Sequence, residues 1–411
     1  MARSKKSGQG KGKDKGAATQ AAARRPATRG STAGKASTSA AAAAPPREAS
    51  LALTELRGRI DAVDEQLHAL LNERAKLARS AGISKHADGH TVDFYRPERE
   101  AQVLRMAMER NHGPLRNEEI LRLFREIMSA CLAQEEPLKV AFLGPEGTYT
   151  QTAVLQHFGH SVRALALPSV DEVFQEVESG AADFGVVAIE NSTEGTITNT
   201  LDRLITSPLK LCGEVELRIH HCLMGRMESL AQVVRVCAHS QALAQTRGWL
   251  NEHLPQAERV AVSSNAEGAR RARDENGTAG IAGEIAAEVY GLKLLAREIE
   301  DRPDNATRFL VLGRKSFRPS GHDRTTLLVS ASDTQASGTL HQLLEPLARY
   351  GISMSRIESR PSRRRKWDYV FFIDIEGHAE DPDVAKALKA LQSRASLFRV
   401  LGSYPRAVLP D

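Results

Sequence analysis

Arg74 is the first residue whose type and position indicate chemistry, because it lies where a helical pattern demands an aliphatic side chain. It interrupts a coiled-coil seam whose apolar members recur at alternating spacings of four and three: Leu56, Ile60, Val63, Leu67, Leu70 and Leu77. A guanidinium on such a seam must meet an anion, since an unpaired buried charge costs several kcal/mol. That anion is either a carboxylate of the protein, such as Glu135, or a bound ligand.

More charged residues fall within the same short stretch of chain. Arg57 lies beside the seam, and Lys85 lies at the end of the same long helix. Arg99 begins the apolar face of a second predicted helix, and Glu135 lies on the apolar face of a third. A single seam arginine would favour an internal ion pair. Four cations and one carboxyl group converging on a small helical core instead indicate a pocket for a small dianion.

Three polar motifs indicate a second site farther along the chain. Gly-Pro-Glu-Gly-Thr-Tyr-Thr (144–150) follows an apolar run and leads into a helix, where free backbone N–H groups favour an anion. Ala-Ile-Glu-Asn-Ser-Thr-Glu-Gly (188–195) closes another apolar run, and Thr-Arg-Phe (307–309) opens a third. Ligands of α/β proteins bind at the carboxyl ends of strands, so these motifs are expected to share one cleft.

The elements that position the first site are three predicted helices. The first begins at Leu53 and meets no Gly or Pro between Leu67 and Gly82, the second starts near Pro97, and the third covers Glu118 to Glu136. Three helices, one of them so long, cannot bury their seams within one short region. We therefore expect an all-α region that exchanges helices in a homodimer or higher homo-oligomer.

An α/β pattern follows Pro137. Short apolar runs alternate with helical segments at 170–179, 242–253 and 265–274, which predicts largely parallel sheets in two lobes. The predicted strands are 139–143, 184–189, 233–237, 259–263, 278–282 and 308–312.

From Arg324 the predicted order becomes βαββαβ, the ferredoxin-like α+β arrangement, which often binds a ligand without catalysing a reaction. Its strands are expected at 325–330, 352–359, 369–376 and 398–404, and its helices at 339–350 and 382–394.

Composition sets the domain organisation of the 411 residues. Residues 1–50 hold 11 Lys and Arg against two acids and almost no large apolar side chain, which predicts a disordered basic tail. We divide the rest into a helical region (51–136), a middle region (138–316) and a C-terminal region (323–405). The four cysteines have no CxxC spacing and no run is long enough to span a membrane, so we expect a cytoplasmic protein.

The helical region resembles the all-helical chorismate mutase, here fused to a second enzyme. Leu-Arg-Gly-Arg-Ile (56–60), Asn-Glu-Arg (72–74), Lys85 and Arg-Glu (99–100) carry the resemblance. It implies that Arg74 and Arg57 of the partner subunit bind the two carboxylates of chorismate, with Arg99 among the substrate-binding cations. It further implies that Lys85 and Glu135 contact the ether oxygen and that Glu100 contacts the ring hydroxyl.

Two positions depart from the mutase pattern. Arg96 stands where many relatives place an aspartate that faces the substrate hydroxyl. Glu135 stands where some relatives have glutamine, and a carboxylate cannot donate a hydrogen bond, so Glu135 is expected to work only when protonated. The rearrangement to prephenate itself needs no proton transfer, metal or cofactor, because holding a reactive conformer and stabilising charge suffice.

The three polar motifs together resemble prephenate dehydratase, with Thr150 and Ala188 as mild departures from the usual serine and proline. The resemblance implies a bilobal fold like that of periplasmic binding proteins, with prephenate between the lobes. Thr307 would be the key catalytic residue and Arg308 the anchor of a substrate carboxylate. The supporting groups would be Glu190, Asn191, Gln241 and Thr148.

The C-terminal region resembles the ACT domain attached to this dehydratase, in which phenylalanine binds between paired domains. Glu-Ser-Arg-Pro (358–361) matches one ligand-binding segment, and Ser-Gly-Thr-Leu (337–340) keeps part of the other. The implied phenylalanine-binding residues are Gly338, Leu340, Glu358, Ser359, Arg360 and Pro361.

The sequence thus predicts a bifunctional enzyme that converts chorismate to prephenate and then to phenylpyruvate under phenylalanine control. Arogenate as the dehydratase substrate and a non-catalytic sensor of small acids stay open as alternatives. Nucleic-acid binding through the basic tail is disfavoured. No cofactor is expected, and His220 and His221 are not expected to chelate a metal, since adjacent strand residues point to opposite faces.

Overall fold

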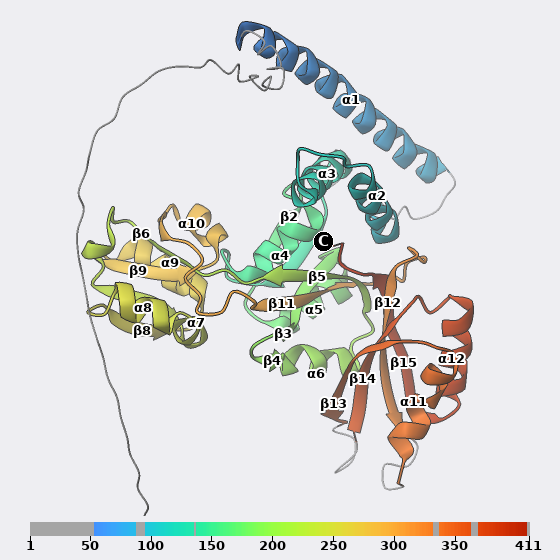
Figure 1. The fold of residues 1–411 in the computed structure, drawn as a ribbon. Helices are drawn as coiled ribbons and strands as arrows, with labels where there is room; N and C mark the ends of the chain where they lie inside the picture. The colour runs from blue at the N-terminus through green and yellow to red at the C-terminus, as the bar shows by residue number, and fades with distance from the viewer. Residues whose placement is uncertain (1–52, 88–94, 135–136, 332–336, 363–368, 409–411) are drawn as a thin grey trace, which may run out of the picture. The chain divides into compact units, whose positions relative to one another are not determined.

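The computed structural model describes residues 53–87, 95–134, 137–331, 337–362 and 369–408, with the side chains of 82–87 left out (Figure 1). The basic tail and Glu135 therefore lie outside the described residues, as does the side chain of Lys85. Within the described part of the chain, no helix combines the length and apolarity that a bilayer crossing requires.

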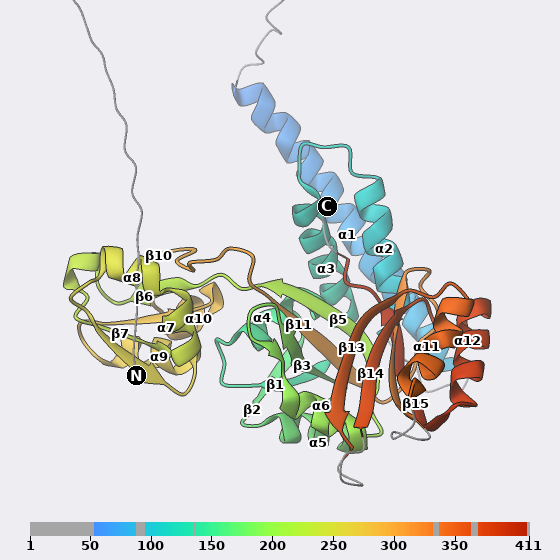
Figure 2. The ribbon, with the colours of Figure 1, turned by 60° about the horizontal axis from the view of Figure 1, so that its bottom comes forward.

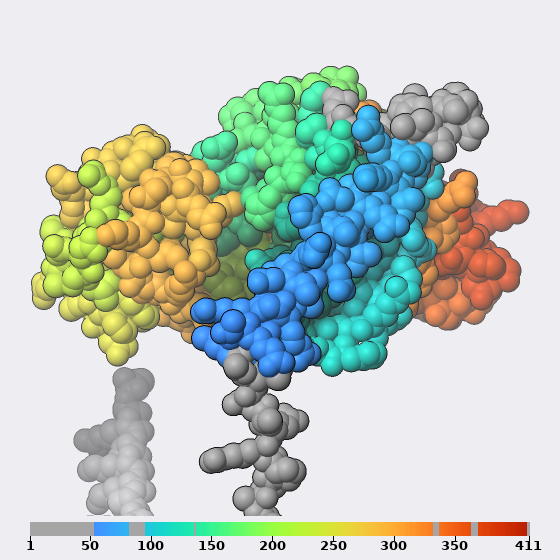
Figure 3. Space-filling model, turned by 90° about the horizontal axis from the view of Figure 1, so that it is seen from above, coloured from blue at the N-terminus to red at the C-terminus, as the bar shows by residue number. Residues whose placement is uncertain are grey.

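The helical region begins with α1 (Leu53–Ala87), a single helix of 35 residues. Its seam is uncovered: Leu67 is 51% exposed and Leu70 is 61% exposed, and the side chains of α1, blue in Figure 3, lie open on the face shown. Burying an aliphatic side chain is worth about 1.5–3 kcal/mol, so this seam is an unused source of stability in the single chain.

The two other helices of this region are α2 (Pro97–Glu109) and α3 (Asn117–Leu132), which pack on each other. The prediction that the third helix runs to Glu136 is wrong, because α3 ends at Leu132. Pro137 disfavours helical geometry in the residue before it, so Glu136 is a poor helix end.

Lobe 1 of the middle region is a mixed sheet with the strand order β2-β1-β3-β11-β5, and β4 pairs with β3. β1 is parallel to β2 and β3, whereas β11 is antiparallel to both β3 and β5. The strands are β1 (Lys139–Leu143), β2 (Arg163–Leu167), β3 (Phe184–Asn191), β4 (Gly195–Thr196), β5 (Lys210–Arg218) and β11 (Ala306–Gly313). The helices are α4 (Tyr149–Phe158), α5 (Val170–Ser179) and α6 (Thr198–Thr206).

Lobe 2 is a separate sheet with the order β10-β6-β9-β7-β8, also mixed in direction. Its strands are β6 (Cys222–Gly225), β7 (Arg235–His239), β8 (Glu258–Val262), β9 (Thr278–Ala282) and β10 (Lys293–Ala296). Its helices are α7 (Ser240–Gln245), α8 (Arg247–His253), α9 (Asn265–Asp274) and α10 (Glu284–Tyr290), with the short 3-10 helix η1 (Leu230–Gln232).

Two lobes are therefore confirmed, but the expectation of largely parallel sheets is wrong. The chain passes from lobe 1 to lobe 2 after β5 and returns before β11, and strands beside these crossings run antiparallel to their neighbours. The predicted helix 242–253 is divided at Thr246, whose hydroxyl donates to the carbonyl of Ala242 over 2.8 Å.

The C-terminal region has the predicted βαββαβ order, with an antiparallel sheet β13-β14-β12-β15. Its two helices cover one face of that sheet (Figure 2), where Leu343 and Leu388 pack against Leu327 and Ile373. The elements are β12 (Asp323–Ala331), α11 (Thr339–Arg349), β13 (Met354–Pro361), β14 (Tyr369–Glu376), α12 (Pro382–Gln392) and β15 (Ala395–Pro405).

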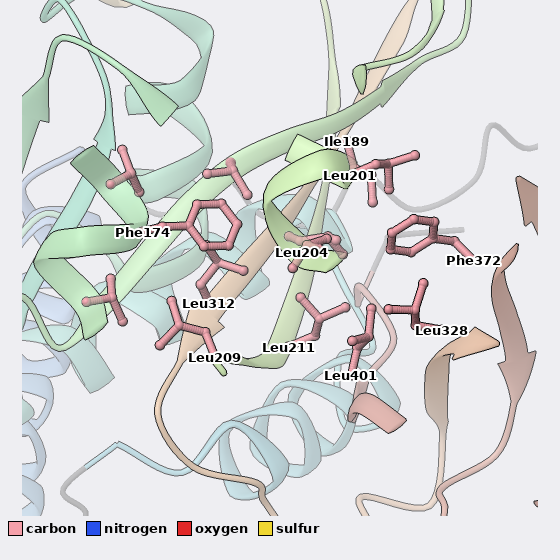
Figure 4. Packing of buried hydrophobic residues seen from close by; sticks show 14 of the residues in the cluster. Phe174, Ile189, Leu201, Leu204, Leu209, Leu211, Leu312, Leu328, Phe372 and Leu401 are labelled. Atoms are coloured by element: carbon pink, nitrogen blue, oxygen red, sulfur yellow. The ribbon is translucent and has the colours of Figure 1, made fainter. Parts of the chain in front are cut away.

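The other face of this sheet shares a hydrophobic core with lobe 1 (Figure 4). Leu328, Phe372 and Leu401 of the C-terminal region lie in one cluster with Phe174 and Leu204 of lobe 1, each at most 1% exposed. The backbones also approach closely, because a Cβ atom on Gly402 would lie 2.1 Å from the carbonyl oxygen of Leu211. Lobe 1 and the C-terminal region are thus packed as one body.

Candidate functional site

Arg74, the seam arginine, is partly buried on α1 and donates from Nη1 to Sγ of Cys131 on α3, over 3.1 Å. Cys131 is only 9% exposed, so this end of the guanidinium reaches into the helical core. The contact therefore places the cation where a small anion could meet it.

Apart from Glu100, the other residues predicted for this first site are either exposed or have no described side chain. Arg57 on α1 and Arg99 on α2 are exposed. Lys85 belongs to the backbone of α1, and Glu135 lies outside the described residues. Among the three of these groups whose side chains the structure describes, Arg74 is the one with a hydrogen bond in the helical core.

Glu100 lies in a different environment from the one expected. It lines a small cavity between α2 and lobe 1 together with Tyr95, Arg125 and His157. Burial raises the pKa of Glu100 to about 7, although Arg125 acts in the opposite direction, and burial lowers the pKa of His157 to about 3. The Tyr95 hydroxyl and His157 Nε2 are 2.8 Å apart. Glu100 therefore faces lobe 1 in the single chain, and its expected contact with a substrate hydroxyl stays a prediction.

Glu98 is a candidate that the sequence reasoning missed. It is partly buried on α2, and its Oε2 atom is buried without a hydrogen-bond partner among the described residues. A buried carboxylate oxygen in that state needs a donor. The sequence signal for Glu98 is its place beside Arg99, in the same motif as the predicted residue Glu100.

The second and third polar motifs meet at one edge of the lobe 1 sheet. Thr307 is paired in register with Asn191 across β11 and β3, and Asn191 Nδ2 donates to Thr307 Oγ1 over 2.8 Å. Asn191 Oδ1 in turn accepts from the backbone N–H groups of Thr193 and Glu194, both over 3.0 Å. The amide is thereby fixed in orientation, and the two predicted residues lie in direct contact.

The Thr307 hydroxyl is an acceptor in this arrangement. Thr307 is 8% exposed, and among the described residues nothing accepts the hydrogen of its own O–H. A hydroxyl has one hydrogen to donate, so this hydrogen is available to a bound molecule.

The first motif forms a capped helix start. Thr148 is the N-cap of α4, and its side chain accepts from the backbone N–H of Gln151. Gly147 has a φ of +83°, which favours glycine, and its N–H donates to Gln151 Oε1 over 2.6 Å. Two of the backbone N–H groups expected to bind an anion therefore donate to side chains of the protein instead.

Gln241 begins the first turn of α7 in lobe 2, partly buried, where its backbone N–H donates to His239 Nδ1 over 3.4 Å. The predicted residues thus come from both lobes.

A hydrogen-bonded chain that the sequence did not reveal continues from Asn191 toward the segments that connect the lobes. Asn191 Nδ2 also donates to Asn305 Oδ1 over 2.9 Å, and Asn305 Nδ2 lies 3.4 Å from Gln245 Oε1. Gln245 Oε1 lies 2.8 Å from His221 Nε2, whose Nδ1 lies 2.7 Å from the Tyr149 hydroxyl. Burial is the main cause that lowers the pKa of His221, which keeps the ring neutral near pH 7.

The adjacent histidines are used for structure. His220 Nδ1 contacts Glu300 Oε1 over 2.7 Å, and the backbone N–H of His221 donates to Glu300 Oε2 over 2.8 Å. No cluster of three or more metal-ligating side chains occurs within the described residues.

Glu190 and Arg308 need correction, because both lie on the face of the sheet opposite to Asn191 and Thr307. Successive residues of a strand alternate between faces, so neighbours of the reactive pair point away from it. Arg308 donates to Asp374 (2.6 Å), Glu214 (2.9 Å) and the Tyr404 hydroxyl (3.0 Å). Burial alone would lower the pKa of Arg308, but these partners raise it above its ordinary value.

Arg308 is therefore occupied by protein carboxylates and does not fit the expected role of substrate anchor. Glu190 is held in the same way, because Arg356 of β13 lies 3.0 Å from its Oε2 atom.

The residues predicted to bind a regulator divide into two groups. Glu358 accepts from the Thr196 hydroxyl over 2.9 Å, and Arg360 donates to Asp202 over 2.9 Å, so these two face lobe 1. The other four are exposed at the surface of the C-terminal region: Gly338, Leu340, Ser359 and Pro361.

Family models match three consecutive parts of the chain. The model described as chorismate mutase type II matches residues 56–136, prephenate dehydratase matches 140–317, and the ACT domain matches 325–392.

Curated relatives match the chain over most of their own length. A bifunctional chorismate mutase/prephenate dehydratase of Stutzerimonas stutzeri is 52% identical over 361 residues, covering 87% of this chain and 98% of the relative. Its counterpart from Pseudomonas aeruginosa is 51% identical with the same coverage.

Solved structures match the middle and C-terminal regions. Prephenate dehydratase of Arthrobacter aurescens, in complex with L-Phe, has a TM-score of 0.61 at 37% identity and covers 67% of this chain and 93% of that one. The enzyme of Staphylococcus aureus has a TM-score of 0.57 at 30% identity and covers 65% of this chain and 100% of that one.

Proposed function

Because this chain belongs to the family of bifunctional chorismate mutases/prephenate dehydratases, with both activities in phenylalanine biosynthesis, we propose how its residues divide the two reactions. The mutase reaction is assigned to the helical region, and the dehydratase reaction to the edge of the lobe 1 sheet. The contact between Asn191 and Thr307 is the observation that carries the second assignment.

For the mutase, Arg74 binds one carboxylate of chorismate, and Arg57 of the partner subunit binds the other. Arg74 reaches the core beside Cys131, whereas Arg57 is exposed in its own chain and free to enter another. Lys85 and a protonated Glu135 contact the ether oxygen, where negative charge develops. Glu98 replaces Glu100 as the acceptor for the ring hydroxyl, because its buried oxygen lacks a donor.

This assignment requires a homodimer in which long helices are exchanged. The exposed seam of α1 supports it, since the apolar side chains between Leu56 and Leu77 are too exposed to stabilise one chain alone. The matching helix of a second copy would bury these side chains. It would also bring Arg57 of the partner subunit into the pocket.

For the dehydratase, Thr307 donates a hydrogen bond to the ring hydroxyl of prephenate and so assists that group as it leaves as hydroxide. Asn191 donates to the Thr307 oxygen, which leaves the Thr307 hydrogen available to the substrate. Loss of carbon dioxide and hydroxide forms an aromatic ring, and the driving force therefore resides in the substrate. Thr148 and Gln241 complete the binding site from lobe 1 and lobe 2, while Glu190 and Arg308 support the strands from behind.

For regulation, phenylalanine binds at the exposed residues of the C-terminal region, between two paired copies, and inhibits the dehydratase. The Arthrobacter aurescens relative is in complex with L-Phe, and the exposed Gly338, Leu340, Ser359 and Pro361 are open to such a ligand. Glu358 and Arg360, which contact lobe 1, relay binding to the enzyme.

One experiment tests these assignments together. Purified protein is incubated with chorismate, and prephenate and phenylpyruvate are followed separately, with and without phenylalanine. Both products are expected, and phenylalanine should reduce phenylpyruvate more than prephenate. Indifference to millimolar phenylalanine would contradict the regulatory part, and faster turnover of arogenate than of prephenate would change the assigned substrate.

A further inference from the structure

Four charged residues form two crossed ion pairs between lobe 1 and the C-terminal region, and we name them the charge quartet. Glu190 and Arg308 are register partners across β3 and β11. Arg356 and Asp374 are register partners across β13 and β14. Each lobe 1 residue pairs with the opposite charge on the other sheet: Arg308 with Asp374 at 2.6 Å and Glu190 with Arg356 at 3.0 Å.

Three of the four side chains of the charge quartet are largely shielded from water, and Glu190 is partly exposed. The exposed fractions of its side chains are 2% for Asp374, 9% for Arg356, 14% for Arg308 and 39% for Glu190. Removing one member of a buried pair leaves its partner's charge uncompensated, which is strongly unfavourable, whereas surface pairs contribute little. Removing Asp374 or Arg356 is therefore expected to disturb the position of the two sheets at this place, because a largely buried partner would lose its counter-charge.

Further contacts stiffen the same cluster. Glu214 also pairs with Arg324, and Thr326 donates to Asp374 Oδ1 over 2.6 Å. Arg356 Nη2 donates to Thr196 Oγ1 over 3.2 Å. The side chains consequently have few alternative positions, so a displacement of β13 or β14 is passed to β3 and β11.

The quartet lies directly behind the reactive pair. Glu190 precedes Asn191, and Arg308 follows Thr307, so each catalytic candidate is joined by one peptide unit to a member of the quartet. The hydrogen bond of 2.8 Å between Asn191 and Thr307 depends on the relative position of the same two strands. A small shift of either strand would lengthen it or turn the Thr307 hydroxyl away from the cleft.

We infer that Arg356 and Asp374 of the C-terminal region are positioning residues of the dehydratase, holding Asn191 and Thr307 in register through Glu190 and Arg308. The same contacts are the route by which a regulator acts, because Arg356 lies on β13 only two residues before Glu358. This second part rests on the proposed binding of phenylalanine at residues 358–361.

The test compares Arg356→Gln and Asp374→Asn with Arg399→Gln in the full-length protein. Arg399 also joins the C-terminal region to lobe 1, but it does so through the carbonyls of Ile205 and Ser207, at the end of α6, to which it donates over 2.6 Å each. Steady-state rates with prephenate are measured with and without phenylalanine, phenylalanine binding is measured by calorimetry, and mutase activity reports that each variant is folded.

We expect Arg356→Gln and Asp374→Asn to lower kcat at least tenfold with KM changed less than threefold. Their phenylalanine affinity should stay within threefold of wild type, while the inhibition at saturation weakens at least fivefold. Arg399→Gln should keep both kcat and inhibition, and Arg356→Lys, which keeps the charge, should regain most of the rate.

Wild-type kcat and inhibition in Arg356→Gln would overturn the inference, as would an equal loss in Arg399→Gln. A rate in Arg356→Lys as low as in Arg356→Gln would also count against it. If the wild-type protein neither binds phenylalanine nor is inhibited by it, the proposed regulation fails, whereas the positioning role is still decided by kcat.

Discussion

The side-chain amide of Asn191 donates to the hydroxyl oxygen of Thr307 over 2.8 Å and leaves the Thr307 hydrogen free to point elsewhere. An oxygen that already accepts a fixed hydrogen bond can direct its own hydrogen toward a leaving group. The dehydratase should therefore depend on the hydroxyl of Thr307 and on the donor character of Asn191.

Replacing Thr307 by Ala should lower the dehydratase kcat by roughly 10²–10⁴-fold, because transition-state assistance to the leaving hydroxyl is lost. Thr307→Ser keeps the hydroxyl and should retain most of the rate. The measurement is phenylpyruvate formation from prephenate, with chorismate consumption as the control for folding. A full dehydratase rate in Thr307→Ala would remove this residue from the mechanism.

Asn191→Asp tests the orientation of the hydroxyl. A carboxylate cannot donate to Thr307 Oγ1, so Thr307 would donate to Asp instead and turn its hydrogen away from the substrate. We expect kcat to fall about 10–100-fold with little change in KM. This loss is at or below the lower limit of the roughly 10²–10⁴-fold that a positioned acid or base contributes. Recovery at low pH, where the carboxyl group is protonated, would support this explanation, and an unaltered rate at pH 7.5 would exclude it.

Replacing Arg74 by Ala should abolish most mutase activity and leave the dehydratase intact, since the two sites lie in different regions of the chain. Arg74→Lys keeps the charge but not the planar fork that binds a carboxylate at two points, and it should recover only part of the rate. Chorismate consumption and phenylpyruvate formation from added prephenate measure the two activities. Equal losses in both would indicate a folding defect.

Glu135→Gln should change the pH dependence of the mutase. A glutamate that must donate a hydrogen bond works only when protonated, so wild-type activity should fall as pH rises through the pKa of this carboxyl group. Glutamine donates at every pH, and the profile of the variant should be flatter. Identical profiles for the two proteins would refute the assignment.

Glu100 should make folding stability depend on pH. Its pKa is raised from 4.5 to about 7 by burial, so the folded state favours the protonated form. Below pH 4.5 both folded and unfolded chains are protonated and no penalty arises. As pH rises from there through 7, the folded chain must ionise a buried group, and stability falls by at most about 3 kcal/mol.

Glu100→Gln should therefore raise Tm at pH 8 and leave it nearly unchanged at pH 4.5, as measured by thermal unfolding against wild type at each pH. A destabilised variant at pH 8 would mean that the attraction of the Arg125 charge outweighs burial. Loss of mutase activity at unchanged Tm would restore the expected substrate contact of this residue.

Much of the fold could be predicted from hydrophobic pattern. β1, β9, α5 and α9 have the predicted bounds, because apolar runs or amphipathic stripes are closed by clear turn residues. β5 was missed, since Gly213, Glu214 and Glu216 interrupt its apolar pattern. Glu214 is buried only because Arg308 and Arg324 neutralise it, and such partners cannot be read from a local window.

Only part of the site could be predicted, again because contacts between distant segments cannot be read from a local stretch of sequence. The motifs identified Asn191 and Thr307, whose contact follows from strand pairing. They gave no indication that Glu190 and Arg308 face the C-terminal sheet, because that depends on which body packs behind β3 and β11. His221 and Tyr149 were missed because their partners come from other elements, far apart in the chain.

The shared core beneath the charge quartet has a consequence for engineering. Leu211, which lies against Gly402, would lose its cover if the chain were cut before Asp323, so deleting the C-terminal region would expose part of the lobe 1 core. A different regulatory domain fused to lobe 1 would need an apolar sheet face that fits this core. It would also need a glycine at the position of Gly402, where a Cβ atom would clash with the Leu211 carbonyl. Single changes in the charge quartet would leave this apolar contact intact, but they would lower kcat together with the response to a regulator.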